Sequence, residues 1–181
     1  LGGTEYFSFV PKALLKNLRT YYNGDGSYKD RPYGMDGSLT TWVKDTNQDG
    51  IINGSDFAYL YAGMRRGGRN FYALDVTSRT APKLKWNILG GTAGSFIEMG
   101  QSWPQPNLSA IRFNNVDYNG TSTSNPPVLI ISGGYDPAQD TKTNLFSGGT
   151  RLGDAYGRAI YVVNAETGAL LWWAGYKDTA K

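Results

Sequence analysis

Short apolar runs, separated by clusters of Gly, Asn, Asp and Ser, recur along most of this chain. The runs are rich in β-branched and aromatic residues and are too short for regular helices, which is the pattern of β-strands joined by turns. Many short strands with glycine-rich turns predict an antiparallel all-β fold, such as a sandwich, a barrel or a propeller. The expected strands cover residues 40–43, 57–64, 71–75, 84–88, 108–113, 128–131, 160–163 and 170–173.

One segment, residues 11–18, favours a helix instead. Pro11 suits the first turn of a helix, and Leu14, Leu15 and Leu18 fall on one face at helical spacing. The residues that follow are rich in Gly, Asp and Tyr and predict a loop. We therefore expect one short helix ahead of the main strands.

An internal repeat decides among the all-β architectures. A strand that begins with an aromatic residue and ends in Asp75 leads to Trp86, and a similar strand that ends in Asn164 leads to Trp172. In both copies the Asp or Asn side chain can cap its own turn. Four-stranded units repeated in this way are typical of the blades of a β-propeller.

The repeat also predicts the domain organisation. We expect about two blades, with a polar insertion at about 135–156 in the second blade and a strand at 6–10 that belongs to another blade. A closed propeller needs at least about four blades. Residues 1–181 are therefore expected to form part of one propeller domain of a longer protein.

Composition and charge exclude several classes of protein. The 181 residues contain no His and no Cys, which rules out a Ser-His-Asp triad, a thiolate nucleophile and a Cys/His zinc site. The formal net charge is only +3 and forms no long basic run, so we expect no nucleic-acid partner. No apolar stretch approaches the roughly 20 residues that a membrane-spanning helix needs.

Oxygen-bearing side chains recur at a characteristic spacing in residues 45–56. They occupy positions 1, 3, 5, 9 and 12 of the segment, with Gly at position 6, as in an EF-hand-type calcium loop whose last ligand is Asp rather than Glu. Hard oxygen donors without nitrogen or sulfur favour Ca²⁺, with Mg²⁺ the less favoured ion. The candidate ligands are Asp45, Asn47, Asp49, the backbone carbonyl of Ile51, Asn53 (directly or through water) and Asp56.

The flanks of this calcium loop predict strands, 40–43 and 57–60, rather than the helices of an EF-hand. The loop is therefore expected to connect two strands. An ordinary turn rich in Asp, Asn and Gly is the alternative interpretation. The number of matching positions favours the metal site over the turn.

Weaker patterns have a structural explanation that we favour over a functional one. Arg65, Arg66 and Arg69 lie near aromatic residues, as in phosphate or single-strand nucleic-acid sites, but a Gly-Gly pair among them predicts a hairpin turn with exposed arginines. Asp136 and Asp140 lack the spacing of a second cation site and predict a turn. Tryptophans are expected to pack between blades rather than to form a ligand platform; they are Trp86, Trp103, Trp172 and Trp173.

Three segments together, residues 45–56, 59–77 and 157–168, resemble the C-terminal propeller of the PilY family of type IV pilus biogenesis proteins. Residues 99–104 and 131–136 fit the same family, so the resemblance covers nearly the whole chain. The family's Arg-Gly-Asp tripeptide, which is linked to integrin binding in some members, is absent.

The resemblance maps the family's calcium loop onto Asp45, Asn47, Asp49, the carbonyl of Ile51 and Asn53. Family members often carry Asp at the last of these positions. Because this chain has Asn53 there, the match is weaker at that position and Asp56 becomes the more important candidate ligand.

The resemblance also implies a function. Such proteins are secreted through the periplasm to the bacterial outer envelope or pilus tip. With minor pilins and the type IV pilus machinery they support pilus assembly, control of retraction, twitching motility and adhesion to host or abiotic surfaces. A calcium-binding adhesin or assembly propeller of this kind is not an enzyme.

Two alternatives remain open. Quinoprotein dehydrogenases are also Trp-rich propellers, in which calcium holds the quinone cofactor; the self-contained calcium loop and the lack of a vicinal Cys pair argue against this class. A calcium-stabilised carbohydrate-binding module is neither supported nor excluded by the residues.

Overall fold

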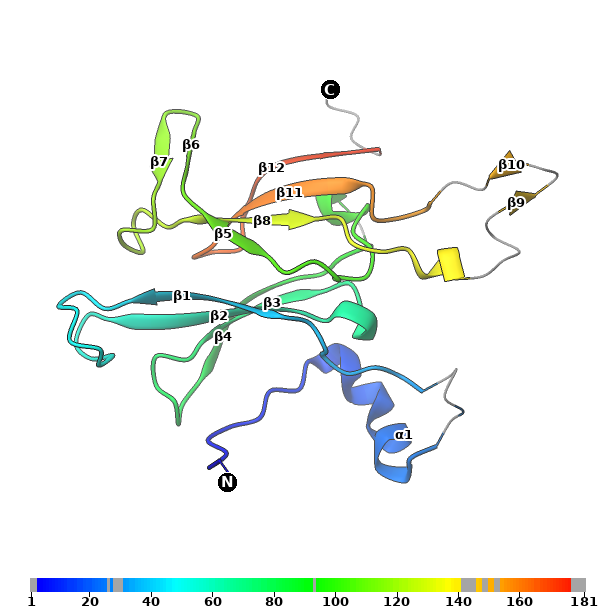
Figure 1. Ribbon diagram of the computed structural model, residues 1–181, viewed down its shortest axis with the longest axis horizontal. Helices are drawn as coiled ribbons and strands as arrows, with labels where there is room; N and C mark the ends of the chain where they lie inside the picture. The colour runs from blue at the N-terminus through cyan, green and yellow to red at the C-terminus, as the bar shows by residue number, and fades with distance from the viewer. Residues whose placement is uncertain are drawn as a thin grey trace.

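The structure of the protein is a computed structural model that describes residues 3–25, 27, 31–92, 94–140, 146–147, 150–151 and 154–176. Two four-stranded antiparallel sheets form the body of the molecule and lie one above the other in Figure 1. The predicted all-β class is confirmed, with one short α-helix near the N-terminus.

The first sheet is a meander whose strands pair in chain order. Apolar and aromatic residues occupy both faces of its two central strands, so these strands are buried along most of their length. A 3-10 helix, η2 (Arg65–Gly67), turns the chain from one central strand into the other. The strands are β1 (Leu39–Lys44), β2 (Phe57–Gly63), β3 (Phe71–Asp75) and β4 (Lys83–Ile88).

The second sheet has the order β12-β11-β8-β5, again with antiparallel neighbours. The connection that enters it from β4 contains a 3-10 helix, η3 (Gly94–Phe96). The strands are β5 (Asn107–Ser109), β8 (Val128–Ser132), β11 (Ala159–Asn164) and β12 (Leu170–Gly175).

A small hairpin interrupts the second sheet where the sequence predicts a single strand at 108–113. The chain leaves β5 at Ala110 and forms β6 (Ile111–Phe113), which pairs with β7 (Val116–Tyr118) instead of extending the sheet. The residues between β6 and β7 are Asn114 and Asn115, with φ of 49° and 62°. Asn tolerates the left-handed region that a two-residue hairpin turn requires, so the single-strand prediction is wrong.

The two sheets repeat each other in detail. β3 and β11 are equivalent, and each pairs with a following strand that carries Trp, β4 or β12. The register of β3 against β4 shifts between Ala73 and Leu74, and that of β11 against β12 shifts between Val162 and Val163. These shifts fall at the same position of the sequence repeat, so the repeat is structural as well.

The predicted insertion at about 135–156 falls between β8 and β11. Its described elements are the 3-10 helix η4 (Pro137–Asp140) and the paired strands β9 (Phe146–Ser147) and β10 (Thr150–Arg151). Residues 141–145, 148–149 and 152–153 of the insertion lie outside the described residues.

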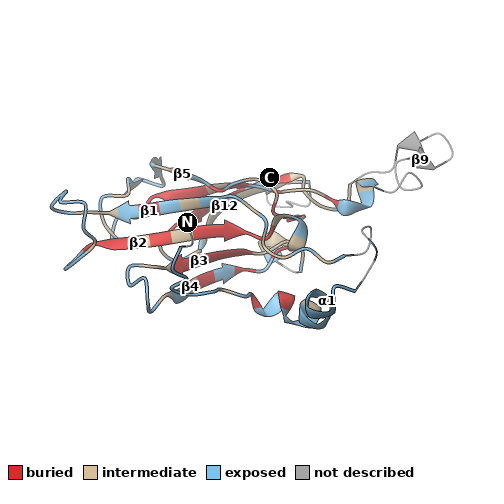
Figure 2. Cartoon of the chain, turned by 60° about the horizontal axis from the view of Figure 1, so that its bottom comes forward, coloured by how far each residue is buried: buried red, intermediate tan, exposed pale blue. Residues whose placement is uncertain are grey.

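An aromatic core fills the space between the two sheets. Tyr61 and Trp86 of the first sheet stack with their ring centroids 5.7 Å apart, and Tyr161 and Trp173 of the second sheet stack at 5.9 Å. Figure 2 shows buried residues running along the strands that face each other, and exposed residues concentrated on loops and on the N-terminal helix. Burial of aromatic surface is thus the main force that holds the sheets together.

The N-terminal segment differs from its prediction in two respects. The helix is split into a 3-10 part, η1 (Lys12–Asn17), and an α-helical part, α1 (Leu18–Asn23). Leu14 is buried, but Leu15 and Leu18 are half exposed, because the tighter 3-10 turn does not keep the α-helical face. Residues 6–10 form no strand, so the strand predicted for this segment is wrong.

Instead of pairing, the N-terminal segment covers the outer face of the first sheet. Phe9 packs edge-on against Tyr72, with the ring centroids 5.5 Å apart. Leu14 and Met64 complete this small cluster. None of the helices in the described part of the chain has the length and apolar character that a membrane crossing requires.

Candidate metal centre

The calcium loop, residues 45–56, connects β1 to β2, as predicted. The strands pair up to Lys44 and Phe57, so the two ends of the loop meet at the end of a hairpin. Trp42, Phe57 and Tyr59 form an aromatic cluster at its base, with Trp42 4.8 Å from Phe57 between ring centroids. This buried base holds the loop ends in fixed positions.

Side chains in the first half of the loop accept hydrogen bonds from its own backbone. The amide of Gly50 donates to Asp45 Oδ2 at 2.8 Å, and the amide of Ile51 donates to Asp49 Oδ1 at 2.8 Å. Asn47 Nδ2 donates to Asp49 Oδ2 at 2.8 Å. Gly50 has φ of +77°, and it makes the reversal that brings these groups together.

Asp56 closes the second half of the loop. Its carboxylate oxygens accept the amides of Thr46 at 2.8 Å and Asn53 at 3.1 Å. The Thr46 amide, followed by the Asn53 amide, lowers the pKa of Asp56 below its ordinary value of 3.8. Asp56 therefore stays ionised and cross-links the start and end of the loop.

The remaining polar atoms test whether the loop suits a cation. Asp45 Oδ1 is buried and accepts no hydrogen bond from the described residues, so it is a carboxylate oxygen that lacks a positive partner. Among the residues that the structure describes, the carbonyl of Ile51 accepts only a long hydrogen bond from Asn53 Nδ2, at 3.3 Å. Both atoms are oxygens that the sequence pattern assigns to the ion, and they fit a hard cation in their chemistry.

The carboxylates are not, however, gathered around one point. Within the described ranges, no three carboxylate, imidazole or thiol side chains stand together at metal-binding distance. All six predicted ligand residues are nevertheless linked to one another or to the loop backbone by hydrogen bonds. The structure thus brings the candidates into one loop without arranging them as a ligand shell.

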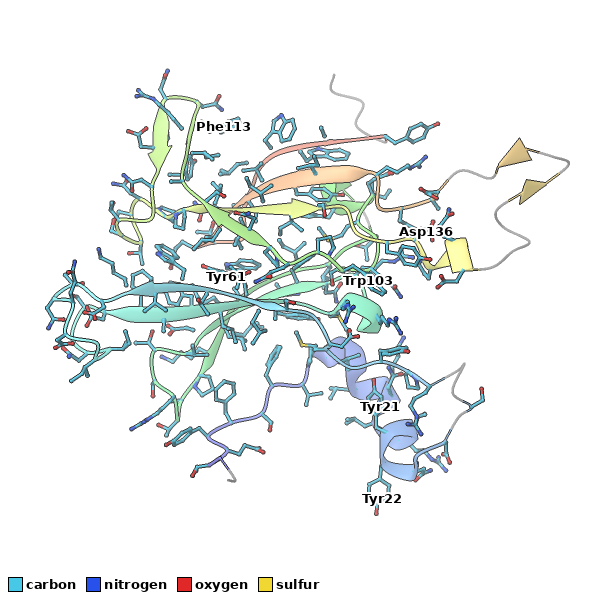
Figure 3. The ribbon with its side chains drawn as sticks, viewed as in Figure 1. Tyr21, Tyr22, Tyr61, Trp103, Phe113 and Asp136 are labelled. Carbon is cyan, nitrogen blue, oxygen red and sulfur yellow. The ribbon has the colours of Figure 1, made fainter. Side chains whose placement is uncertain are left out.

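The second acidic pair behaves as the predicted turn. Asp136 is buried, and its oxygens accept the amides of Ala138 at 3.0 Å and Ala155 at 2.8 Å, which ties the two ends of the insertion together. Asp140 accepts a hydrogen bond from the Tyr135 hydroxyl. Figure 3 shows Asp136 at the root of the insertion.

The arginine segment forms the predicted hairpin connection, between β2 and β3, but its arginines lie against aromatic rings. Arg65 and Arg66 both lie over the ring of Trp103, with their guanidinium carbons 4.5 and 5.1 Å from the ring centroid. Arg69 lies 3.6 Å from the ring centroid of Tyr156. Trp103 therefore serves as a surface for arginines, whereas Trp86 is in the core, Trp173 packs against the core and Trp172 is 45% exposed.

Sequence reasoning missed Ser102, which organises this arginine segment. Ser102 is buried, and its Oγ accepts the amides of Met64 at 2.7 Å and Arg65 at 3.1 Å. It also lies within donating distance of the carbonyls of Gly68 and Asn70. A lone serine after Gln carries no sequence signal, because its partners are thirty or more positions away in the chain.

Comparison with known proteins identifies relatives of the chain. No family model matches it. The type IV pilus biogenesis factor PilY1 of Pseudomonas aeruginosa is 27% identical over 137 residues, which are 71% of this chain and 11% of that protein. A PilY1 homolog of Xylella fastidiosa is 28% identical over 170 residues, 93% of this chain and 9% of that protein.

A solved structure shares the fold. The crystal structure of the Pseudomonas aeruginosa PilY1 C-terminal domain matches with a TM-score of 0.54 at 20% identity, and the match covers 99% of this chain and 28% of the solved one. The chain spans about a tenth of the length of the curated relatives it matches. The curated relatives and the shared fold thus confirm the predicted resemblance of this chain to a C-terminal segment of PilY family proteins.

Proposed function

We propose that this chain is a calcium-binding β-propeller segment of a type IV pilus biogenesis protein. The proposal rests on similarity, over 71% and 93% of the chain, to proteins named type IV pilus biogenesis factors. The fold that the chain shares with the PilY1 C-terminal domain supports it.

The propeller part of the proposal is supported by how the sheets are arranged. Both sheets have four antiparallel strands that pair in chain order, although the second sheet carries insertions between its strands. The two sheets share one hydrophobic core. Their first strands, β1 and β5, lie near each other, and the Thr40 hydroxyl donates to the Pro106 carbonyl at 2.6 Å. Consecutive blades whose first strands converge are the geometry of a propeller, and the parent protein would supply the other blades.

The calcium part is supported by the loop between β1 and β2. Asp45, Asp49 and the Ile51 carbonyl would hold the ion, together with Asn47 and Asn53. Ca²⁺ would supply the positive charge that Asp45 Oδ1 lacks and would replace repulsion among the carboxylates with ordering of the loop. Asp56 already accepts hydrogen bonds from two backbone amides. Its main proposed role is therefore to close the loop, and its role as a ligand of the ion is secondary.

The biological role follows from the family resemblance. We infer that the parent protein acts at the bacterial surface, at the pilus tip, with minor pilins and the type IV pilus machinery. There it would support pilus assembly, oppose retraction, sustain twitching motility and promote adhesion to surfaces. The ordered calcium loop would act as a metal-dependent staple on the first hairpin.

Terbium luminescence tests the calcium proposal. Tb³⁺ occupies calcium sites, and Trp42 at the base of the loop should sensitise its emission in the purified protein. We expect emission that Ca²⁺ displaces and that Asp49→Ala abolishes. Asp117→Ala removes an exposed carboxylate on β7 and serves as the matched control. Emission that persists in Asp49→Ala, or that is lost equally in the control, would contradict the site.

A motility assay tests the pilus proposal separately. In the bacterium that encodes the parent protein, deletion of its gene should abolish surface pili and twitching zones, and the wild-type gene should restore both. Asp49→Ala should restore them only in part. Normal pili in the deletion strain would overturn the pilus function whatever the terbium result.

A further inference from the structure

A cavity of about 450 Å³ lies at the end of the first sheet opposite to the calcium loop. Four separate segments contribute to it: the chain ahead of β1, the η2 turn, the connection from β4 to β5, and the start of the insertion. Figure 3 shows Trp103 where the η2 turn approaches that insertion. The lining residues are Tyr33, Arg66, Gln101, Trp103, Tyr135 and Asp140.

The walls of this pocket are aromatic rings. Trp103 and Tyr135 meet at a ring-centroid distance of 5.8 Å and an angle of 65°. The guanidinium carbon of Arg66 lies 5.1 Å from the ring centroids of both Trp103 and Tyr33, and its Nη1 donates to the Tyr33 hydroxyl at 2.8 Å. The volume suits a small molecule, and the lining combines aromatic rings with about as much polar surface from groups such as Arg66, Gln101 and Asp140.

The polar groups of the pocket provide both donors and an acceptor. Among the described residues, no carboxylate lies within ion-pair distance of the Arg66 guanidinium, and only one of its donors is used, by Tyr33. The carboxylate of Asp140 accepts the Tyr135 hydroxyl, which raises the pKa of Tyr135. The lining therefore carries one positive and one negative charge, which cancel.

The framework of the pocket is formed before any ligand arrives. Gln101 Oε1 accepts the Trp103 indole N–H at 3.0 Å, and Gln101 Nε2 donates to the Arg66 carbonyl at 3.3 Å. Ser102 holds the η2 turn from beneath. At Gly134 a Cβ would lie 2.1 Å from the Gln101 carbonyl oxygen, so only glycine allows this approach. Rigid walls reduce the entropy cost of binding.

We propose that this pocket binds a neutral saccharide. The apolar C–H face of a pyranose ring would pack on the parts of Trp103 and Tyr135 that line the pocket and that Arg65 and Arg66 leave uncovered. Arg66 and Asp140 would offer a donor and an acceptor to its hydroxyl groups. The balanced charge disfavours an anion such as phosphate. A peptide added as a strand finds no free edge, because the backbones of Gln101 and Tyr135 pair with each other at 2.7 and 2.9 Å.

Saturation-transfer NMR tests the proposal on the purified protein with the methyl glycosides of glucose, galactose, mannose and N-acetylglucosamine. We expect transfer to the ring protons of at least one glycoside. Trp103→Ala should abolish it, and Asp140→Asn, a change at an exposed residue that leaves the core intact, should weaken binding at least tenfold. Trp172→Ala removes an exposed Trp of β12 and should leave the signal unchanged.

Three outcomes would overturn the proposal. They are no transfer to any of the four glycosides, transfer that survives Asp140→Asn and Trp103→Ala unchanged, and binding at Trp103 of inorganic phosphate or of an acidic peptide in place of the glycosides. Because the calcium loop takes no part in the pocket, Asp49→Ala should leave saccharide binding intact. A failed calcium site and a failed saccharide site are therefore distinguishable.

Discussion

The Tyr61 hydroxyl donates to the backbone carbonyl of Ala165 at 3.0 Å, across the interface between the two sheets and across 104 positions of sequence. The indole N–H of Trp86 donates to the same carbonyl at 3.1 Å. Ala165 is fully buried in the turn from β11 to β12. Two strands of the first sheet thus fix the position of one turn of the second, and the stacked rings of Tyr61 and Trp86 exclude water from both hydrogen bonds.

Tyr61→Phe should lower the stability of the folded protein only modestly. The Ala165 carbonyl keeps its bond to Trp86, so no acceptor is left unpaired, and the expected loss is about 0.5–1.5 kcal/mol. Urea unfolding at neutral pH measures it. A loss above roughly 3 kcal/mol would show that the hydroxyl has a role beyond this one bond.

The same variant should also change the response to alkali. Burial, aided by the negative charge of Glu166, raises the pKa of Tyr61 well above its ordinary value of 10.0. The folded state then retains a proton that the unfolded state releases, so stability is full below about pH 10 and falls as the pH rises further. Urea midpoints measured across this range should fall less steeply in Tyr61→Phe. Parallel slopes would contradict the assignment, and Tyr6→Phe, at an exposed site, is the control.

Asp45 and Asp56 should separate metal binding from loop closure. Asp45→Asn removes the buried carboxylate oxygen without a partner and should weaken Ca²⁺ binding at least tenfold, with little change in thermal stability in EDTA. Asp56→Asn removes an acceptor from the amides of Thr46 and Asn53 and should lower the thermal midpoint even in EDTA. Calorimetric titration and thermal melts measure the two effects. Identical behaviour of both variants would refute this division.

Acid should weaken the loop through Asp56. Its pKa is lowered in the folded state, so its stabilisation is present above the ordinary value of 3.8 and is lost as the pH falls through the folded pKa. Acid unfolding, followed by Trp fluorescence, should therefore begin at a lower pH in the wild type than in Asp56→Asn, which lacks this carboxylate. Asp56→Asn should accordingly lose less of its remaining stability as the pH falls below the ordinary value of 3.8.

Gly168→Ala should disturb the interface between the sheets. Gly168 has φ of +71°, and a Cβ there would lie 2.7 Å from the Trp86 ring, which is itself fixed by its bond to Ala165. Backbone strain and steric overlap together predict a loss of about 2–4 kcal/mol, with a shift in Trp emission. Gly24→Ala has a similar φ of +67° but open space around it, so it should show only the strain, about 1–2 kcal/mol. Equal losses in the two variants would contradict a role for Trp86.

The ion pair of Glu98 and Arg158 should matter far more than the exposed pair of Arg112 and Asp117. Glu98 is fully buried and its Oε1 lies 3.0 Å from Arg158 Nε, whereas the exposed pair is separated by 3.7 Å. Glu98→Ala leaves a partly buried arginine without its carboxylate and should lower the free energy of unfolding by about 2–4 kcal/mol. Asp117→Ala should change stability by less than about 1 kcal/mol. Denaturant titration of both variants checks the contrast.

Much of the β-structure follows from local pattern, but the predicted strand at 6–10 fails for a reason that lies outside that pattern. Strand β3 has the bounds that its run of aromatic and apolar residues predicts, because such a run is buried on both faces wherever it lies in a sheet. The predicted strand at 6–10 is apolar in the same way, yet it packs Phe9 onto Tyr72 and forms no pairing. Strand formation needs a neighbouring edge as well as a suitable pattern.

The two candidate sites also differ in how far the sequence predicts them. The calcium loop is readable from sequence because its proposed ligands lie within residues 45–56, and the hairpin that presents it is local as well. The pocket around Trp103 is not readable, because Tyr33, Arg66 and Tyr135 come from distant segments and carry no spacing in the chain.

The sequence by itself determined the strand content, the repeat of the two sheets and the position of the oxygen-rich loop, since each depends on residues that are neighbours in the chain. Only the tertiary structure decided that Asp56 closes the loop through backbone amides, that Ser102 supports the arginine turn and that Trp103 meets Tyr135. The Ser102 and Trp103 contacts join segments that are distant in the chain, and the Asp56 contacts depend on the conformation of the loop backbone. Burial and hydrogen bonding, which no local pattern records, select them.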